Sequence, residues 1–417
     1  MEERHRRAWE KLALYPLTRP RGATGRHSPR RRARAPTRPA PSRAVPLSTE
    51  PARVDADPRR ADEIARALRL AQEGRERELE HALRTLGFTR RLTPRALAYA
   101  AEYHAMRAAA GEHGHAPHAG CVCALDGALA PALLARARAA LGPDARFWRE
   151  TGYLGSSAPV GYFSYVHALS APATSAMDEL IARVRALIMP HFPLVSRARY
   201  AEWWAHNRAH GCGHQLHFDS DNEGDGGVRN PIASVVLFLS AAGGPTLVTQ
   251  QTLASNALAP HGWLAYPREN RLVAFDGRLL HSVVPGRAAF ATDRRRVTVM
   301  VAFWRDIRTL APPSGAGAGA GAAGASALGP ARSFPDPRAP GTPAWVADFA
   351  PLGAADGGLS DSEGGAGCGG EVRVAPVVPV RPVWLHVQPA AEEPGGGGTG
   401  GQASLALPPY DELFQGL

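Results

Sequence analysis

The sequence predicts a mainly β core flanked by α-helices, with irregular segments before and after it. Strand-like runs rich in β-branched and aromatic residues follow one another between Tyr200 and about Leu310. Helical periodicity dominates the part before them, from Pro58 onward. Proline and arginine crowd residues 1–50, and glycine and alanine alternate after Pro312. At 417 residues, the chain is long enough for more than one domain.

Residues 1–50 are predicted to be a basic disordered tail. They hold 13 basic and 4 acidic residues, a net +9 of the chain's formal +10, so the rest of the chain is nearly neutral. This balance does not predict nucleic acid as a partner of the core. The acid-free stretch 11–49 is compatible with organelle targeting, and residues 29–34 with a nuclear signal, although a solvated tail explains both.

Residues 51–120 are predicted to be a helical segment, in which Thr93-Pro94 marks the start of a second helix. Two more helices are expected at 133–141 and 176–189, the second with a buried stripe that includes Leu180, Ile181 and Val184. The histidines at 113, 115 and 118 and the cysteines at 121 and 123 have metal-ligand chemistry. Their spacing matches no structural zinc pattern, so a glycine-rich loop is the preferred interpretation.

The strands are expected from Tyr200 onward. Residues 232–239 form an apolar run typical of a buried strand, and Gly243-Gly244-Pro245 is the turn to the next one. Residues 297–304 form another strand, directly after three arginines. If Arg296 faces the interior, strand alternation places Thr298, Met300, Ala302 and Trp304 on the same side.

Residues 311–370 are predicted to be a low-complexity linker and residues 371–417 an extended segment, whose prolines restrict it to a sheet edge or a surface groove. The cysteines (Cys121, Cys123, Cys212 and Cys368) are too few and too unevenly spaced for a disulfide framework. No apolar run approaches the length of a membrane span, of roughly 20 residues. We therefore expect an intracellular protein, cytoplasmic or nuclear, without a membrane partner.

Two histidines and a carboxylate form the candidate catalytic and metal site. His217 and Asp219 are two residues apart, so on a strand they point to the same face, and His281 would join them from another strand. Such a set on one face of an ion is typical of non-haem Fe(II) oxygenases. His217 and Asp219 alone are better explained by a hydrogen bond between them at a polar strand edge, and it is His281 and Arg296 that make the metal site the preferred interpretation. His214 is an alternative ligand, but Leu216 and Phe218 alternate against His217 and Asp219.

Arg296 and Thr298 are the candidate cofactor-binding residues. An inward arginine with a hydroxyl two residues further on can bind a carboxylate through charge-assisted hydrogen bonds. Tyr200, Trp203 and Trp204 are candidates to line the same pocket, although core packing explains them equally well. Asp221, Glu223 and Asp225 are interpreted as a solvated acidic loop rather than a second metal site, and Cys212 as a bystander.

Residues from about 201 to 307 resemble the catalytic core of the 2-oxoglutarate/Fe(II)-dependent dioxygenases, in their prolyl 4-hydroxylase-like branch. The matching pieces are His217-x-Asp219, the 243–248 turn and strand, the strand ending at Phe275, the segment 281–285 and Arg296-x-Thr298. The resemblance implies a jelly-roll core (a double-stranded β-helix) in a dioxygenase domain at 121–310, with its core at 200–307. It implies Fe(II) held by His217, Asp219 and His281, and 2-oxoglutarate held by Arg296 with Thr298.

The arginine departs from the family pattern, because Arg296 follows His281 by more residues than is usual. A hairpin insertion at 287–293 would account for this, and Arg287, Arg294 and Arg295 remain candidates for the same role. The family often uses lysine here, but Lys11 is the chain's one lysine.

The resemblance implies O2 as co-substrate, succinate and CO2 as products, and ascorbate as an optional addition. The expected substrate is a protein side chain, of prolyl type, or a small metabolite. Nucleic-acid demethylases of this superfamily carry a second arginine, at the position that Ala302 occupies here. Two other functions stay open: a catalytically silent jelly-roll binding scaffold, and a zinc-bound hydrolase.

Overall fold

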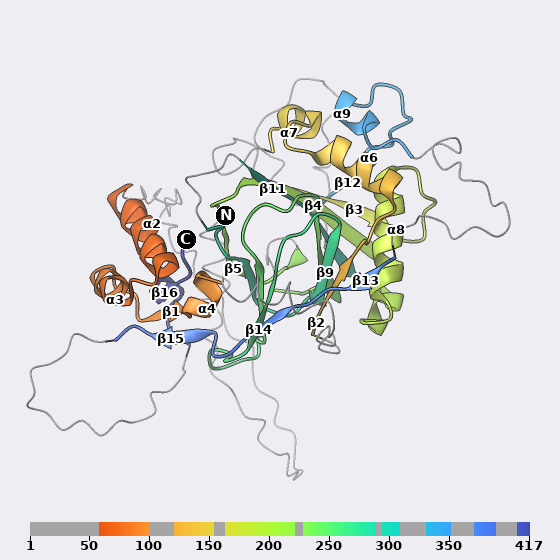
Figure 1. Ribbon diagram of the computed structural model, residues 1–417. Coiled ribbons are helices and arrows are strands. Elements are labelled where there is room, and N and C mark those ends of the chain that lie inside the picture. Colours follow the sequence, from red (N-terminus) through yellow and green to blue (C-terminus); the bar gives the residue numbers. More distant parts are fainter. Residues whose placement is uncertain are drawn as a thin grey trace, which may run out of the picture.

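The computed structural model describes residues 58–99, 121–153, 163–221, 228–287, 294–308, 331–351, 371–388 and 407–417. Two facing β-sheets lie at its centre, with helices outside both of them (Figure 1). The predicted tail at 1–50 and the histidines at 113, 115 and 118 lie outside the described residues.

Eight consecutive strands form the centre of the two sheets. The larger sheet contains β4 (Tyr200–Ala209), β6 (Ala233–Phe238), β9 (Arg271–Asp276) and β11 (Arg295–Trp304). The smaller sheet contains β5 (His214–His217), β7 (Thr246–Thr249), β8 (Gly262–Ala265) and β10 (His281–Val283). The orders are β4-β11-β6-β9 and β8-β7-β10-β5, and all these pairs are antiparallel. This order is that of a jelly roll, so the predicted fold class is confirmed.

Further strands extend both sheets at their edges. In the larger sheet, β12 (Ala331–Ser333) and β3 (Ser164–Ala168) lie beyond β4, while β2 (Val122–Asp126) and β13 (Arg373–Val374) lie beyond β9. In the smaller sheet, β14 (Val378–Val380) pairs with β8. The segment 371–388 therefore returns to sheet edges, as its prolines predict.

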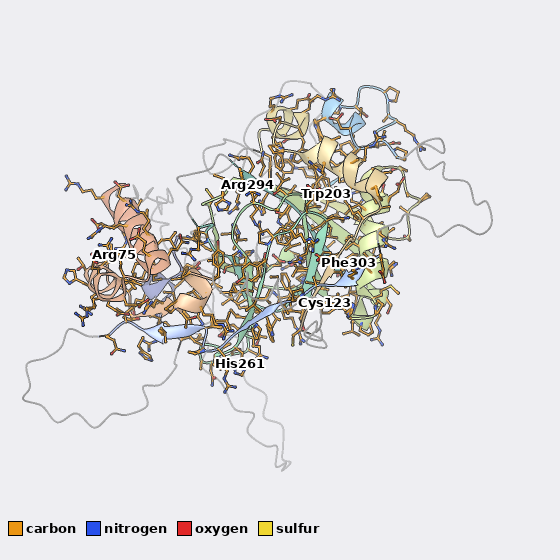
Figure 2. All side chains as sticks on the ribbon, in the orientation of Figure 1. Arg75, Cys123, Trp203, His261, Arg294 and Phe303 are labelled. Carbon is orange, nitrogen blue, oxygen red and sulfur yellow. The ribbon has the colours of Figure 1, made fainter. Side chains whose placement is uncertain are left out.

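One group of helices covers the outer face of the larger sheet. These are α6 (Pro131–Leu141), α7 (Arg146–Thr151), α8 (Ala176–Ile188), the 3₁₀ helix η2 (Pro193–Arg197) and α9 (Ala344–Ala347). Their apolar residues share one buried cluster with Trp203 of β4 and Phe303 of β11, both labelled in Figure 2. The helices predicted at 133–141 and 176–189 are confirmed.

A second group covers the outer face of the smaller sheet. It consists of α2 (Pro58–Glu73), α3 (Glu76–Thr85), β1 (Arg90–Leu92), α4 (Pro94–Leu97), β15 (Trp384–His386), the 3₁₀ helix η5 (Tyr410–Glu412) and β16 (Leu413–Phe414). Strand β1 lies between β15 and β16, so segments far apart in the sequence share one small sheet. Apolar residues of this group form one buried cluster with Leu216 and Phe218.

Two interpretations of local sequence are wrong. Residues 331–351, expected within the linker, form β12 and α9 and bury Trp345, Val346 and Phe349 on the helical side of the larger sheet. Cys123, expected in a glycine-rich loop, lies buried in β2 and pairs with Ala274. Each segment has few apolar residues, so its secondary structure could be recognised only once strands distant in the sequence were placed beside it. In the described part of the chain, no helix is long and apolar enough to cross a membrane.

Candidate metal centre and buried arginine

The structure brings His217, Asp219 and His281 together between the two sheets. His217 ends β5 and faces His281, the first residue of β10, in the pairing of these antiparallel strands. Asp219 follows two residues after His217, on the same side, while Leu216 and Phe218 point outward into the opposite cluster. One ligand atom from each of the three lies within 4.8 Å of the other two. His217, Asp219 and His281 are the one such group among the described residues that could hold a metal ion.

In both imidazoles Nδ1 is hydrogen-bonded to a backbone carbonyl, which leaves Nε2 to face the Asp219 carboxylate. Nδ1 of His217 lies 2.7 Å from the Gln215 carbonyl, and Nδ1 of His281 lies 3.1 Å from the Leu279 carbonyl. A carbonyl only accepts, so Nδ1 carries the proton and Nε2 presents a lone pair.

The contacts between the three groups are too long for hydrogen bonds. The two Nε2 atoms lie 3.7 Å and 3.6 Å from Asp219 Oδ1, and the buried Nε2 of His281 has no hydrogen-bond partner. A buried, unpartnered lone pair costs free energy that a bound cation would recover. The donor set therefore fits a divalent transition metal, with the two-histidine, one-carboxylate ligands of Fe(II) sites.

Neighbouring polar groups fix the position of Asp219. Ser234 Oγ, on β6, donates to Asp219 Oδ2 at 2.5 Å. Asn230 Nδ2 donates to the Asp219 backbone carbonyl at 2.8 Å. Such contacts set the orientation of a ligating carboxylate, and the sequence did not reveal them.

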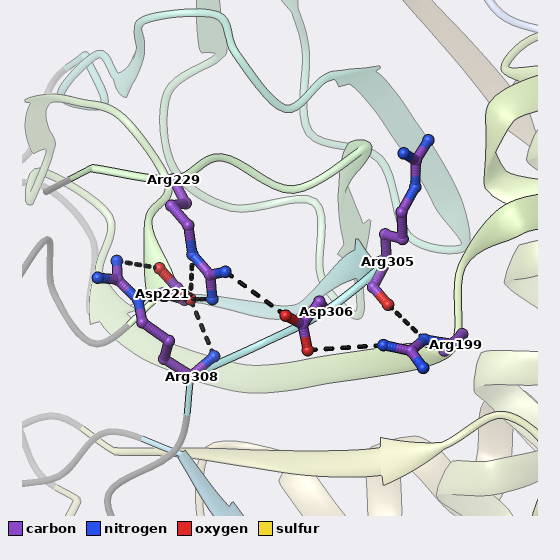
Figure 3. A network of polar contacts seen from close by, with 6 residues as sticks. All are labelled: Arg199, Asp221, Arg229, Arg305, Asp306 and Arg308. Atoms are coloured by element: carbon purple, nitrogen blue, oxygen red, sulfur yellow. Dashed lines mark hydrogen bonds and ion pairs between the residues drawn. The ribbon is translucent and has the colours of Figure 1, made fainter. Parts of the chain in front are cut away.

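The sequence suggested that Asp221 is solvated. In the structure it is fully buried in an ion-pair network (Figure 3). Arg308 Nη2 donates to Asp221 Oδ1 at 2.6 Å, and Arg229 Nε donates to Oδ2 at 3.0 Å. Burial alone would raise the pKa of Asp221, but the hydrogen bonds from the two arginines outweigh it and lower this pKa. The interpretation was wrong because Arg308 is 87 residues from Asp221 in the sequence, and the spacing of 8 residues between Asp221 and Arg229 matches no local pairing pattern. Glu223 and Asp225 lie outside the described residues.

Arg296 lies in the interior with 1% of its surface exposed and no carboxylate partner among the described residues. Its Nη1 lies 3.4 Å from Thr298 Oγ1 and its Nη2 lies 3.2 Å from Thr246 Oγ1, while its buried Nε has no partner. Its guanidinium carbon lies 5.0 Å from the centre of the Phe238 ring. Burial, and then the charge of Arg208, lower the pKa of Arg296 to about 9. A buried cation without an anion is unfavourable, so the Arg296 guanidinium suits a ligand carboxylate.

The other candidate arginines lie elsewhere. Arg294 is exposed, and Arg295 donates to the side chain and the backbone carbonyl of Asn207. Arg287 donates to the carbonyls of Ala98 and Gln72 in the helical group outside the smaller sheet. Arg296 is therefore the buried one of the four.

The alternation predicted for β11 is confirmed. Met300, Ala302 and Trp304 join the cluster between the sheets, whereas Val297, Val299, Val301 and Phe303 join the cluster under the helices.

The remaining candidates divide between the same two faces. Trp204 lies in the cluster between the sheets, and Tyr200 packs against this cluster. Trp203 lies under the helices, and Cys212 is exposed. His214 lies beside His217, with ring centres 4.4 Å apart, outside the metal-holding group. Glu202, which the sequence did not single out, accepts from Ser164 Oγ at 2.5 Å, and burial raises its pKa to about 7.

Comparisons with known proteins give structural likeness without sequence likeness. No protein-family model matches the sequence, and no curated protein matches it either. The chain is similar to a Pseudomonas putida prolyl-4-hydroxylase, with 20% identity, 45% of this chain and 94% of that chain covered, and a TM-score of 0.28.

It is also similar to a viral collagen prolyl hydroxylase from Paramecium Bursaria Chlorella virus-1, solved with 2-oxoglutarate, with 14% identity, 45% and 98% covered, and a TM-score of 0.27. HygX from Streptomyces hygroscopicus, solved with nickel and 2-oxoglutarate, shares 11% identity, with 45% and 83% covered and a TM-score of 0.28. At these identities and TM-scores, none of the three assigns an activity to this chain.

Proposed function

We propose that this protein is an Fe(II)- and 2-oxoglutarate-dependent dioxygenase with its catalytic domain at residues 121–310. One observation carries the proposal: the His217–Asp219–His281 group, in which Asp219 and His281 are buried, shares the space between the two sheets with a buried guanidinium, that of Arg296, which lacks an anion among the described residues. Thr246, which Arg296 contacts, lies on β7, and β7 pairs with the strand β10 that carries His281. The space between the two sheets would thus hold both a metal ion and one carboxylate of a dicarboxylate.

Each side chain has a defined task under this proposal. His217, Asp219 and His281 would hold Fe(II), which when bound supplies dioxygen activation coupled to decarboxylation of the 2-oxo acid. Arg296 would bind the distal carboxylate of 2-oxoglutarate, and Thr298 and Thr246 would orient the guanidinium. Ser234 keeps Asp219 in place. Phe275, whose ring centre lies 4.7 Å from that of His281, excludes water from one side of this imidazole.

The reaction class that follows is hydroxylation of a protein side chain, of prolyl type, or of a small metabolite, with release of succinate and CO2. Ascorbate is not linked to any residue described above and enters only as an assay component. A catalytically silent scaffold is the alternative, and it requires that 2-oxoglutarate does not bind.

The test measures succinate release from 2-oxoglutarate by purified protein with Fe(II) and ascorbate, and 2-oxoglutarate affinity by calorimetry on metal-loaded protein. His217→Ala is expected to reduce turnover to background, because it removes a metal ligand. Arg296→Ala is expected to cost about 2–5 kcal/mol of 2-oxoglutarate binding, thirty-fold or more in affinity, because it removes the buried cation. Arg294→Ala, at the exposed neighbouring position, is the matched control and should resemble wild type.

Other outcomes point to other functions. Wild-type protein without turnover and without 2-oxoglutarate binding would support the scaffold. Zinc retained after anaerobic purification, together with hydrolysis of an ester substrate, would support the hydrolase. If Arg294→Ala lost 2-oxoglutarate affinity and Arg296→Ala kept it, the carboxylate role would pass to Arg294.

A further inference from the structure

Strand β5, which carries His217, lies at the end of the smaller sheet. The sheet order is β14-β8-β7-β10-β5, so within the described part of the chain β5 has a strand partner on one side, β10. The peptide groups of its other edge need partners from elsewhere if they are buried. Leu216, directly before His217, is 1% exposed.

Two side chains from the segment 408–417 supply those partners. Gln415 Oε1 accepts from the Leu216 backbone N–H at 2.7 Å. Tyr410 Oη donates to the Leu216 carbonyl at 3.1 Å, and it also lies 3.4 Å from Gln215 Oε1. Both side chains are buried. Together they pair both the N–H and the carbonyl of Leu216, as a neighbouring strand would.

The residue they hold, Leu216, directly precedes His217, whose imidazole faces Asp219 and His281. The Leu216 carbonyl belongs to the peptide bond that enters His217, and the Gln215 carbonyl accepts from Nδ1 of the same ring. A shift of this stretch therefore changes both the backbone position of His217 and the hydrogen bond that directs its Nε2 toward Asp219. Mutation of the outer contacts that orient a metal ligand typically lowers metal affinity or activity by about 10–100-fold.

The segment that carries Gln415 is itself anchored outside the jelly roll. Strand β16 pairs in parallel with β1, and Phe414 is fully buried against Phe88, with ring centres 5.3 Å apart. A Cβ at Gly213 would lie 2.5 Å from Leu417 Cδ2, so this end of the segment packs closely on the turn before β5. The position of Gln415 is thus set by packing that does not involve the metal group.

We infer that Gln415, together with Tyr410, is a positioning residue of the metal centre, and that the segment 408–417 adjusts metal affinity through the Leu216 peptide. The inference rests on the proposed metal site and adds to it a residue nearly 200 positions away in the sequence. Sheet-edge protection alone would predict a loss of stability but no selective loss of metal binding.

The test measures Co(II) binding to metal-free protein under anaerobic conditions, by the visible absorption of the bound ion, together with thermal unfolding. Gln415→Met keeps the length of the side chain but removes the acceptor, and it is expected to lower Co(II) affinity roughly ten-fold or more. Gln415→Glu keeps an acceptor oxygen for the Leu216 N–H and should restore most of the affinity. Amide hydrogen exchange at Leu216 should be faster in Gln415→Met than in Gln415→Glu.

Phe349→Ala is the control. It removes buried packing from the other side of the larger sheet and leaves both hydrogen bonds to Leu216 in place. We expect it to lower stability without an equal loss of Co(II) affinity. Wild-type affinity in Gln415→Met, or an equal affinity loss in Phe349→Ala, would overturn the inference. Wild-type protein that binds no Co(II) would instead remove the proposed metal site, and this inference with it.

Discussion

Gly243 makes room for the buried guanidinium at the scale of a single residue. A Cβ at Gly243 would lie 2.4 Å from Arg296 Cδ and 2.9 Å from its Cβ and Cγ. The backbone of Gly243 also has a φ of +91°, which favours glycine. Because β11 fixes the start of the Arg296 side chain, the absence of a side chain at Gly243 determines where the guanidinium lies.

Gly243→Ala is therefore expected to displace Arg296 and to lower 2-oxoglutarate affinity at least ten-fold, with Co(II) affinity unchanged within about two-fold, a difference of less than 0.5 kcal/mol. Calorimetry with each ligand on the same preparation checks both values. Gly341→Ala is the matched control, since Gly341 has a φ of +77° but no atom within 4 Å of its added Cβ. If both variants bound 2-oxoglutarate equally well, Gly243 would be a turn residue and no more.

The sequence predicts the ligands at this scale better than their supports. His217, Asp219, His281 and Arg296 stand out because the required residue types occur at strand spacing or in a short motif. Ser234, Thr246 and the partners of Asp221 did not stand out. A lone serine, threonine or arginine has no distinctive pattern until the fold places it beside a partner.

The helix α8 shows how local sequence determines one element. Ser175 Oγ accepts from the Asp178 backbone N–H at 3.2 Å, and the Asp178 carboxylate accepts from the Ser175 N–H at 2.9 Å, which together form a capping box. The buried stripe of α8 then packs on the outer face of the larger sheet, away from the candidate site.

Ser175→Ala is expected to lower the free energy of unfolding by about 1 kcal/mol, because it removes the cap from a helix end with unsatisfied N–H groups. The melting temperature should fall by about 2–4 °C. Thermal unfolding measures this, and succinate release should stay at the wild-type level. Ser333→Ala, at the exposed end of β12, is the control and should leave the melting temperature unchanged. A loss of turnover at temperatures where Ser175→Ala stays folded would link α8 to the site.

Elements with strong internal periodicity, such as α6, α8, β6 and β11, were predictable from the sequence. Strands β2, β3 and β12 were not, because each is short and gains its stability from partners far along the chain. Residues 331–351 were hidden for the same reason, between stretches of glycine and alanine.

At the scale of the whole molecule, β5 and the residues that follow it separate the interior of the jelly roll from the apolar cluster outside the smaller sheet. His217 and Asp219 point into the jelly roll, while Leu216 and Phe218 point into the cluster that the helices α2–α4 and the segments at 384–387 and 410–414 build outside it. A different cluster, on the other side of the larger sheet, contains Phe349 and the helices α6 and α8. The sequence predicted that the segment after residue 371 is extended, but it could not predict that β16 would lie beside β1, since no pattern links them.

Phe414→Ala and Phe349→Ala form a matched pair that tests this division. Both side chains are fully buried phenylalanines on opposite sides of the molecule, and each truncation is expected to cost about 3–5 kcal/mol by chemical denaturation. Hydrogen exchange distinguishes them. Amides of β5 and β10 should exchange faster in Phe414→Ala, whereas amides of α8 and β3 should exchange faster in Phe349→Ala, because local opening follows the cluster that has lost its packing.

Metal binding should follow the same division. Co(II) affinity is expected to fall in Phe414→Ala, which loosens the outer support of β5, and to stay near wild type in Phe349→Ala. If both variants accelerated exchange at the same amides and lost Co(II) equally, the two clusters would unfold as one cooperative unit. The helical group outside the smaller sheet would then contribute to global stability alone. It would not give β5 the specific support that the positions of Leu216 and Phe218 predict.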